Sequence, residues 1–221
     1  MGLDMYLEKA KRIGNVTPRQ LNAVNEYFDY LGRGEKYKDC TMKEWCGIDI
    51  SEVDMSLVAE YSKERITRYY SWDEEKKYGH ESFIEMVGYW RKANHIHNWF
   101  VENIQGGNDD CGKYEVTKEQ LEELLKVCKT VLNSSTLVGG KIVNGQRMVN
   151  GERENIYEDG EYVADHSVAE ELLPTTSGFF FGSTEYDQWY MADVKHTIEI
   201  IENVLETTNF EHEIVMYCSS W

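Results

Sequence analysis

Proline, paired cysteines and long apolar runs are scarce in this sequence of 221 residues, and each shortage excludes a class of protein. The two prolines, Pro18 and Pro174, leave no proline-rich linker between domains. No apolar run approaches the ~20 residues that a membrane-spanning helix needs. The five cysteines form no Cys-x-x-Cys pair and no secretory signal precedes them, so we expect reduced thiols in a soluble cytoplasmic protein.

Basic residues are also few, with 23 Lys and Arg against 40 Asp and Glu and a formal net charge of −17. Proteins that follow a phosphate backbone carry a basic surface, so general nucleic-acid binding is disfavoured. Residues 141–221 hold 4 basic and 16 acidic side chains, or −12, which leaves −5 for the first 140 residues. The acidic last third either maintains solubility or presents carboxylates to a basic host protein, and the first part can still provide a pocket for a small anion.

Motifs of familiar catalytic and cofactor sites are missing. The sequence has no phosphate-binding loop with its lysine, no Gly-x-Ser-x-Gly and no Ser-His-Asp order. Cys111 has no basic residue fixed beside it that would activate its thiol. We therefore predict no cofactor, no metal and no catalytic residue.

The sequence does contain enough apolar residues for one core, and a surplus of aromatic ones. Hydrophobic residues make up 41% of the chain, which at this length predicts a single domain over residues 1–221. The 15 Tyr and 6 Trp suit a core, a ligand pocket or an interface, and they are compatible with a homodimer.

Local patterns predict short strands interspersed with helices. Apolar spacing and capping residues, such as Thr17 before Pro18 and Thr117 before Gln120, mark the helix starts. Strands are expected at residues 3–11, 83–88, 114–116, 179–181 and 214–217. Helices are expected at residues 18–31, from 41, in parts of 53–70, at 89–104, from 117, at 167–173, and from the turn at 182–184 to 205.

Residues 137–163 contain Asn-Gly twice, at 144–145 and 150–151, which is a strong hairpin signal between apolar residues. We predict a β-ribbon insertion or flap in this segment. Together with the other elements, it predicts an α+β fold with a short, mainly antiparallel sheet and several helices.

The densest group of chemically useful side chains lies in the helix predicted at residues 89–104. On a helix, Arg91 and His95 share one face. Cationic side chains bind phosphate or carboxylate, and a tryptophan can stack on a base. The candidates for a small anionic, nucleotide-like ligand are Trp90, Arg91, Lys92, Asn94 and His97. The alternative is that Trp90 and His97 pack in the core and the cations are solvated.

Two further interpretations involve the same region. His95-x-His97 suits a metal on a strand, whereas on a helix the two imidazoles diverge by about 200°. Asp109 and Asp110 after Gly-Gly either position a water or cation, or form an ordinary loop turn.

A second candidate block runs from residue 178 to 189. A Gly-Ser-Thr turn that leads into a helix presents backbone NH groups, which bind anions. Ser183, Thr184, Tyr186 and Trp189 are the candidate ligand-binding residues here. The alternative is ordinary helix capping by Ser183 or Thr184, with Glu185 and Asp187 favourable to the helix dipole.

Several of these blocks resemble a family of phage and prophage proteins. The similar pieces lie at residues 1–7, 89–94, 96–97, 99–100, 109–112, 172–174, 178–183, 186–187 and 189–190. The resemblance implies a phage accessory protein that acts in the cytoplasm of the bacterial host. Small accessory proteins of phages often counter host defence, and some sequester nucleotide-derived immune signals.

We therefore expect a non-enzymatic protein that binds and sequesters a small nucleotide-derived ligand, such as a host immune signal. One alternative is a hydrolase or phosphodiesterase that uses His97 with Asp109 and Asp110. The other is an acidic inhibitor that binds a host protein through residues 141–221.

Overall fold

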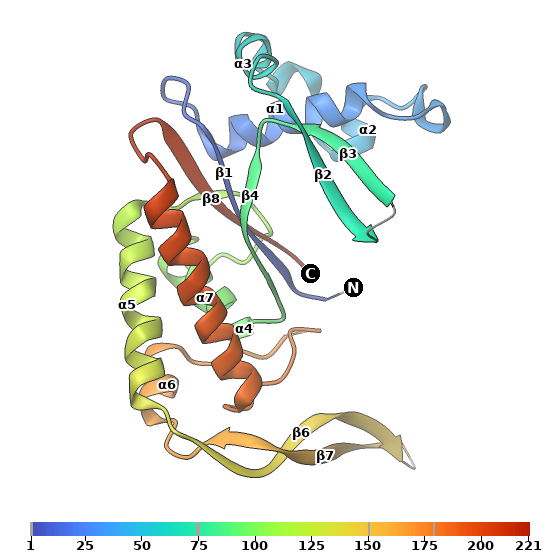
Figure 1. Ribbon diagram of the computed structural model, residues 1–221. Helices are drawn as coiled ribbons and strands as arrows, with labels where there is room; N and C mark the ends of the chain where they lie inside the picture. Colours follow the sequence, from blue (N-terminus) through green and yellow to red (C-terminus); the bar gives the residue numbers. More distant parts are fainter. Residues whose placement is uncertain (1, 74–75, 150, 179) are drawn as a thin grey trace. The chain divides into compact units, whose positions relative to one another are not determined.

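The computed structural model describes residues 2–73, 76–149, 151–178 and 180–221 (Figure 1). Contacts within the chain define two compact units, which we describe separately. The first unit comprises residues 1–7, 87–208 and 217–221, and the second comprises residues 8–86 and 209–216. The prediction that residues 1–221 form one domain stays a prediction.

The predicted α+β class is confirmed, with seven α-helices and antiparallel sheets in the described part of the chain. The largest sheet has four strands in the order β4-β1-β8-β5. These strands are β1 (Asp4–Lys11), β4 (Glu85–Arg91), β5 (Tyr114–Glu115) and β8 (Glu213–Ser220). The alternating Leu3, Met5 and Leu7 are fully buried, as the period of two predicts.

In the second unit, helices α1 (Pro18–Leu31), α2 (Met42–Cys46) and α3 (Met55–Tyr61) accompany the hairpin of β2 (Ile66–Asp73) and β3 (Lys76–Ser82). Short 3-10 helices lie at Glu35–Tyr37 and Ile50–Glu52. The core of this unit includes Phe28, Tyr61 and Phe83. The helical content expected in residues 53–70 therefore ends at Tyr61, because residues from Ile66 onward pair across the hairpin.

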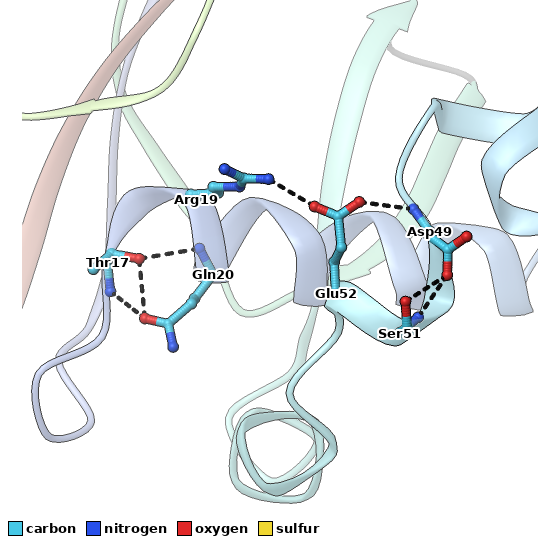
Figure 2. A network of polar contacts seen from close by, with 6 residues as sticks. All are labelled: Thr17, Arg19, Gln20, Asp49, Ser51 and Glu52. Carbon is cyan, nitrogen blue, oxygen red and sulfur yellow. Dashed lines mark hydrogen bonds and ion pairs between the residues drawn. The ribbon is translucent and has the colours of Figure 1, made fainter.

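Capping boxes fix several helix starts in the second unit. Thr17 accepts a hydrogen bond from the Gln20 amide, and the Gln20 side chain accepts one from the Thr17 amide (Figure 2). Asp49 and Glu52 form the same arrangement, and Arg19 links the two boxes through a 2.7 Å ion pair with Glu52. Each box satisfies two amides that the helix cannot, which is why the sequence signal locates these starts well.

The first unit contains α4 (Asn94–Asn103), α5 (Lys118–Ser134), α6 (Ser167–Leu172) and α7 (Gln188–Thr207). Helices α5 and α7 pack side by side (Figure 1). No helix of the described residues has the length and apolar character required to cross a membrane.

The predicted ribbon at residues 137–163 is confirmed as the hairpin of β6 (Leu137–Val149) and β7 (Glu152–Val163) (Figure 1). Its register runs from Leu137 opposite Val163 to Val149 opposite Glu152. The first Asn-Gly pair does not make the hairpin turn: it lies at a register shift between Val143 and Gln146. Gly145 has a φ of 127° there, which glycine adopts without strain.

The helix expected at residues 89–104 is wrong over its first part. Residues 88–91 alternate between buried and exposed as the end of β4, and the Lys92 amide donates to the Leu3 carbonyl at 2.8 Å. Lys92 then adopts a left-handed φ of 62°, and α4 begins at Asn94. Arg91 and His95 therefore do not share a helix face, because they belong to different elements.

The strand expected at residues 179–181 is also wrong for its described residues. Phe180 lies in a loop with a left-handed φ of 65°, and Phe179 lies outside the described residues. The last helix begins at Gln188, with Asp187 as its N-cap, so neither Ser183 nor Thr184 caps it. Asp187 accepts hydrogen bonds from the amides of Trp189 and Tyr190 at 2.8 and 3.1 Å.

Candidate ligand-binding site

A cavity of about 1020 Å³ lies in the first unit, and four segments of chain line it. They are the turn between β4 and α4, the register shift of the ribbon with Asn155 opposite it, the loop at residues 180–185, and the first turns of α7. The lining includes six of the nine residues expected to bind a ligand: Arg91, Lys92, Asn94, Ser183, Thr184 and Trp189.

Two cationic residues lie at the turn between β4 and α4. Arg91 and Lys92 are both exposed, and neither forms an ion pair with another residue in the described part of the chain. The N-cap of α4 is Ala93, whose side chain cannot accept a hydrogen bond from the first turn. The two cations and the helix dipole favour an anion here, whereas the exposed carboxylate of Glu185, which lines the same cavity, opposes one.

The loop at residues 180–185 contacts this turn and is held in place by Asn94, which is 1% exposed. Its side-chain amide donates to the carbonyls of Phe181 and Ser183 at 3.2 and 2.7 Å. Its side-chain oxygen accepts from the Thr176 amide at 3.0 Å. Asn94 is thus occupied in positioning residues 176–183, so the expectation that it contacts a ligand is replaced by a positioning role.

Glycine at position 182 completes this arrangement. Gly182 has a φ of 96°, and a Cβ there would lie 3.0 Å from the Lys92 carbonyl oxygen. Only glycine suits both the left-handed backbone and the close approach to the Lys92 turn. Lys92 and Phe180 also have left-handed φ values, so three unusual backbone positions cluster at one cavity wall.

Carboxylates at the start of α7 also line the cavity. Asp187 is 2% exposed; its Oδ1 caps the helix, and its Oδ2 is buried without a hydrogen-bond partner among the described residues. The carboxylate of Asp193, one and a half turns along α7, forms no hydrogen bond or ion pair with a described residue. Burial, together with the neighbouring charge of Asp187, raises the pKa of Asp193 to about 7.

His95 lines the cavity as a neutral imidazole. It is 3% exposed, and burial lowers its pKa to about 3. Its ring packs on Tyr190 with centroids 4.2 Å apart, and its Nε2 is buried without a hydrogen-bond partner. This histidine therefore contributes a polar edge and no positive charge.

Trp189 supplies the aromatic surface of the cavity. Its side chain is 56% exposed, as expected of a residue that stacks on a ligand and not of one that fills a core. Phe180, which is 52% exposed, lines the same cavity.

Three of the expected ligand-binding residues do not line the cavity. Trp90 is 2% exposed, and its indole NH donates to the Thr197 hydroxyl at 2.9 Å, so it belongs to the core. Tyr186 stacks on His166 with centroids 4.8 Å apart, and its hydroxyl accepts from the Thr175 amide at 3.3 Å.

His97 is the third, and both of its ring nitrogens have partners within the protein. Nδ1 lies 2.7 Å from the Tyr217 hydroxyl, and Nε2 lies 3.0 Å from Asp109 Oδ2. The imidazole is 1% exposed. Burial and the charge of Asp109 raise the pKa of Tyr217 well above its ordinary value.

The two adjacent aspartates near His97 have different roles. Asp109 contacts His97 and also accepts a hydrogen bond from the Trp221 indole at 3.1 Å. Asp110 instead organises its own loop, where it accepts from Gly112, Asn108 and Tyr114 at 2.8 to 2.9 Å. Among the described residues, no group of three His, Cys, Asp or Glu side chains is arranged to hold a metal ion.

The sequence interpretation missed the acidic side of the cavity. Asp187 carried a recognisable signal, since Asp before an apolar helical pattern is a common N-cap, but Ser183 and Thr184 offered the same signal. Asp193 carried none, because a single acidic residue on a long amphipathic helix ordinarily faces solvent.

Comparison with protein-family models, with curated proteins and with solved structures gives no match. The geometry of the cavity is therefore the main basis for assigning it a role.

Proposed function

We propose that this chain is a non-enzymatic binding protein that holds a small nucleotide-derived ligand in the cavity of its first unit. The observation that carries the proposal is that one cavity is lined by an exposed tryptophan, by two cations without an ion-pair partner among the described residues, and by carboxylate oxygens without a hydrogen-bond donor among them. A nucleotide needs all three kinds of group, because it has a phosphate, an aromatic base and hydrogen-bond donors on that base.

Each part of the ligand has a counterpart in the cavity. The phosphate contacts Arg91 and Lys92 beside the first turn of α4. The base stacks on Trp189, since base–aromatic stacking is worth about 1–3 kcal/mol. The cavity of about 1020 Å³ is at the upper end of the usual range of about 300–1,000 Å³ for small-molecule sites.

Sequestration explains the absence of an assembled reaction centre in this cavity better than turnover does. The imidazole at the cavity is buried and neutral, and in the described part of the chain neither Ser183 nor Thr184 donates a hydrogen bond from its hydroxyl to a basic side chain. The resemblance to phage and prophage proteins suggests that the ligand is a nucleotide-derived immune signal of the bacterial host.

The test is isothermal titration of the purified chain with mononucleotides, cyclic dinucleotides and ADP-ribose, followed by chromatography of each mixture. We expect one class to bind and to be recovered intact. A double variant, Arg91→Gln with Lys92→Gln, removes both cations, and its affinity should fall at least about tenfold, because each charge-assisted hydrogen bond is worth about 1.5–3 kcal/mol.

The matched control is Lys118→Gln with Lys126→Gln, which changes the net charge equally on the exposed surface of α5. Its affinity should stay within about threefold of the parent, since exposed charges contribute little at physiological salt. Equal losses in both double variants would show that the effect is general electrostatics and would contradict the assignment of the cavity.

One observation keeps the hydrolase alternative open, namely the hydrogen bond between His97 and Asp109. A ligand converted to a new product in the chromatography step, with the conversion lost in His97→Gln, would favour that alternative. The acidic inhibitor remains a proposal as well. It predicts salt-sensitive binding of a host protein by residues 141–221, where some carboxylates, such as Asp159, are already paired.

A further inference from the structure

The carboxylates at the start of α7 face the cavity with unmet hydrogen-bonding capacity. Asp187 Oδ2 is buried and unpartnered, and the carboxylate of Asp193 forms no hydrogen bond or ion pair with a described residue. A buried acceptor without a donor is costly, which makes the buried Asp187 Oδ2 a candidate contact for a bound molecule. Both line the same cavity as Arg91 and Lys92.

Neighbouring donors of the protein are already committed to other acceptors. The Tyr190 hydroxyl donates to the Leu173 carbonyl at 2.9 Å, and the Tyr190 amide donates to Asp187 Oδ1. The His95 ring is neutral and so brings no charge to balance the two acids. The nearest cations that line the cavity, Arg91 and Lys92, stand on the β4–α4 turn. Among the described residues, none donates a hydrogen bond to Asp187 Oδ2 or to the Asp193 carboxylate, so a ligand with N–H groups can supply these bonds.

From this arrangement we infer that the Asp187–Asp193 side of the cavity recognises a planar edge with two adjacent N–H donors, as guanine and guanidinium groups present. This inference rests on the proposed function in so far as guanine is the source of that edge. Guanine offers its N1–H beside its N2 amino group, which matches the two oxygens of one carboxylate. Adenine offers an acceptor, N1, beside its amino group, and that acceptor is repelled by a carboxylate.

The arrangement orients the ligand as well as selecting it. With the base edge at Asp187 and Asp193 and the phosphate at Arg91 and Lys92, the ligand spans the cavity. Trp189 lies between Asp187 and Asp193 in the sequence of α7, one residue past its start, and lines the same cavity. A guanine nucleotide thus has a donor edge, a stacking face and an anionic end that match three sides of one site.

The experiment is calorimetric titration of the whole chain at pH 8, where Asp193 is mostly ionised, with GMP, IMP, AMP and agmatine. IMP is the matched probe, since it differs from GMP by the 2-amino group alone. We expect the affinity for GMP to be about tenfold or more higher than that for AMP, and the affinity for IMP to be intermediate. The reason is that each hydrogen bond lost to a charged acceptor lowers the affinity by about tenfold or more. Agmatine carries a guanidinium without base or phosphate and reports on the donor edge alone.

Asp193→Asn is the diagnostic variant, because it replaces one acceptor oxygen by a donor without changing the size of the side chain. We expect the ratio of GMP to AMP affinity to fall by about tenfold or more in this variant. The control is Asp54→Asn in the second unit, where Asp54 caps α3 through the amides of Ser56 and Leu57. That substitution keeps an N-cap and should leave the ratio unchanged.

The outcomes separate this inference from the proposed function. Nucleotides that bind with no preference for guanine, or with AMP tightest, would overturn the inference and leave nucleotide binding intact. Agmatine binding that requires Asp193, without binding of GMP, IMP or AMP, would support the donor edge, and the proposed function would then depend on the titrations with cyclic dinucleotides and ADP-ribose. No binding by any of the four compounds would overturn the inference, and no binding of the cyclic dinucleotides and ADP-ribose as well would overturn the proposed function.

Discussion

Asn94→Ala is the substitution that tests most directly how this cavity is built. Asn94 is almost completely buried and makes three hydrogen bonds to the backbone of residues 176, 181 and 183. Alanine keeps the helix start and removes all three bonds. A typical intramolecular hydrogen bond contributes about 0.5–1.5 kcal/mol, so three of them predict a loss of about 2–4 kcal/mol in the free energy of unfolding.

Urea denaturation measures this loss, and Asn98→Ala is its control. Asn98 lies one turn further along α4, is partly buried, and its side chain forms no hydrogen bond with a described residue. Its replacement should change the free energy of unfolding by no more than about 0.5 kcal/mol. Hydrogen exchange gives a local readout, because the Thr176 amide donates to Asn94 and should exchange at least about tenfold faster in Asn94→Ala.

A loss below about 1 kcal/mol, or one equal to that of Asn98→Ala, would refute the idea that Asn94 holds this loop. Unchanged exchange at Thr176 would refute it independently of global stability. Affinity for the ligand should fall in parallel with the loosening of residues 176–183, since Ser183 and Thr184 lie on the cavity wall.

Three further predictions concern the core, the acidic side and the rim of the cavity. Trp90→Phe should lower the free energy of unfolding by about 1–3 kcal/mol in urea titrations, because it loses a buried indole hydrogen bond, whereas Trp189→Phe should stay within about 0.5 kcal/mol. The pKa of Asp193 rises from about 4 in the unfolded chain to about 7, so its contribution to stability is present below pH 4 and is lost as the pH rises through 7. Asp193→Asn should therefore flatten the pH dependence of stability between pH 4 and 7 and be more stable than the parent at pH 8. Gly182→Ala should cost about 1–3 kcal/mol in a thermal melt, because its φ of 96° and the nearby carbonyl oxygen disfavour a Cβ, while Gly139→Ala, with open space around it, should cost almost nothing.

Features decided within a few residues were predictable from the sequence. The capping boxes that begin at Thr17 and Thr117 are complete in the structure, because both partners lie three residues apart. The ribbon at residues 137–163 was also predictable, since two Asn-Gly pairs between apolar residues leave few alternatives. The position of the turn was less certain, because both pairs carry the same signal and only the register of the two strands decides between them.

Features decided by distant partners were not predictable. The apolar pattern of residues 89–92 fits a helix as well as a strand. Their strand conformation is determined by a distant segment, since the Lys92 amide donates a hydrogen bond to the Leu3 carbonyl. The start of the last helix was misplaced for a similar reason. Asp187 caps it where the chain bridges to Tyr162 of the ribbon, a contact that no local pattern contains.

These errors had unequal consequences for the candidate site. Moving Arg91 from a helix to the end of β4 leaves it at the cavity, because the turn at Lys92 keeps both cations on the wall formed with residues 180–185. The same change removes Trp90 from the site, since alternate residues of a strand point to opposite faces. A sequence analysis that groups neighbours along the chain finds the right region, but only the backbone conformation determines which of two adjacent residues lines the cavity.

The charge of the whole chain and the charge of the cavity have to be considered separately. A net charge of −17 opposes the approach of an anion at long range, but this field is screened beyond about 8 Å at physiological ionic strength. Inside the cavity, Arg91 and Lys92 share the lining with Glu185, Asp187 and Asp193. Such a site binds an anion alone less strongly than the two cations would by themselves, because the acids partly offset them. It gains most from a ligand that is anionic at one end and rich in donors at the other, and this requirement is what favours a nucleotide over inorganic phosphate.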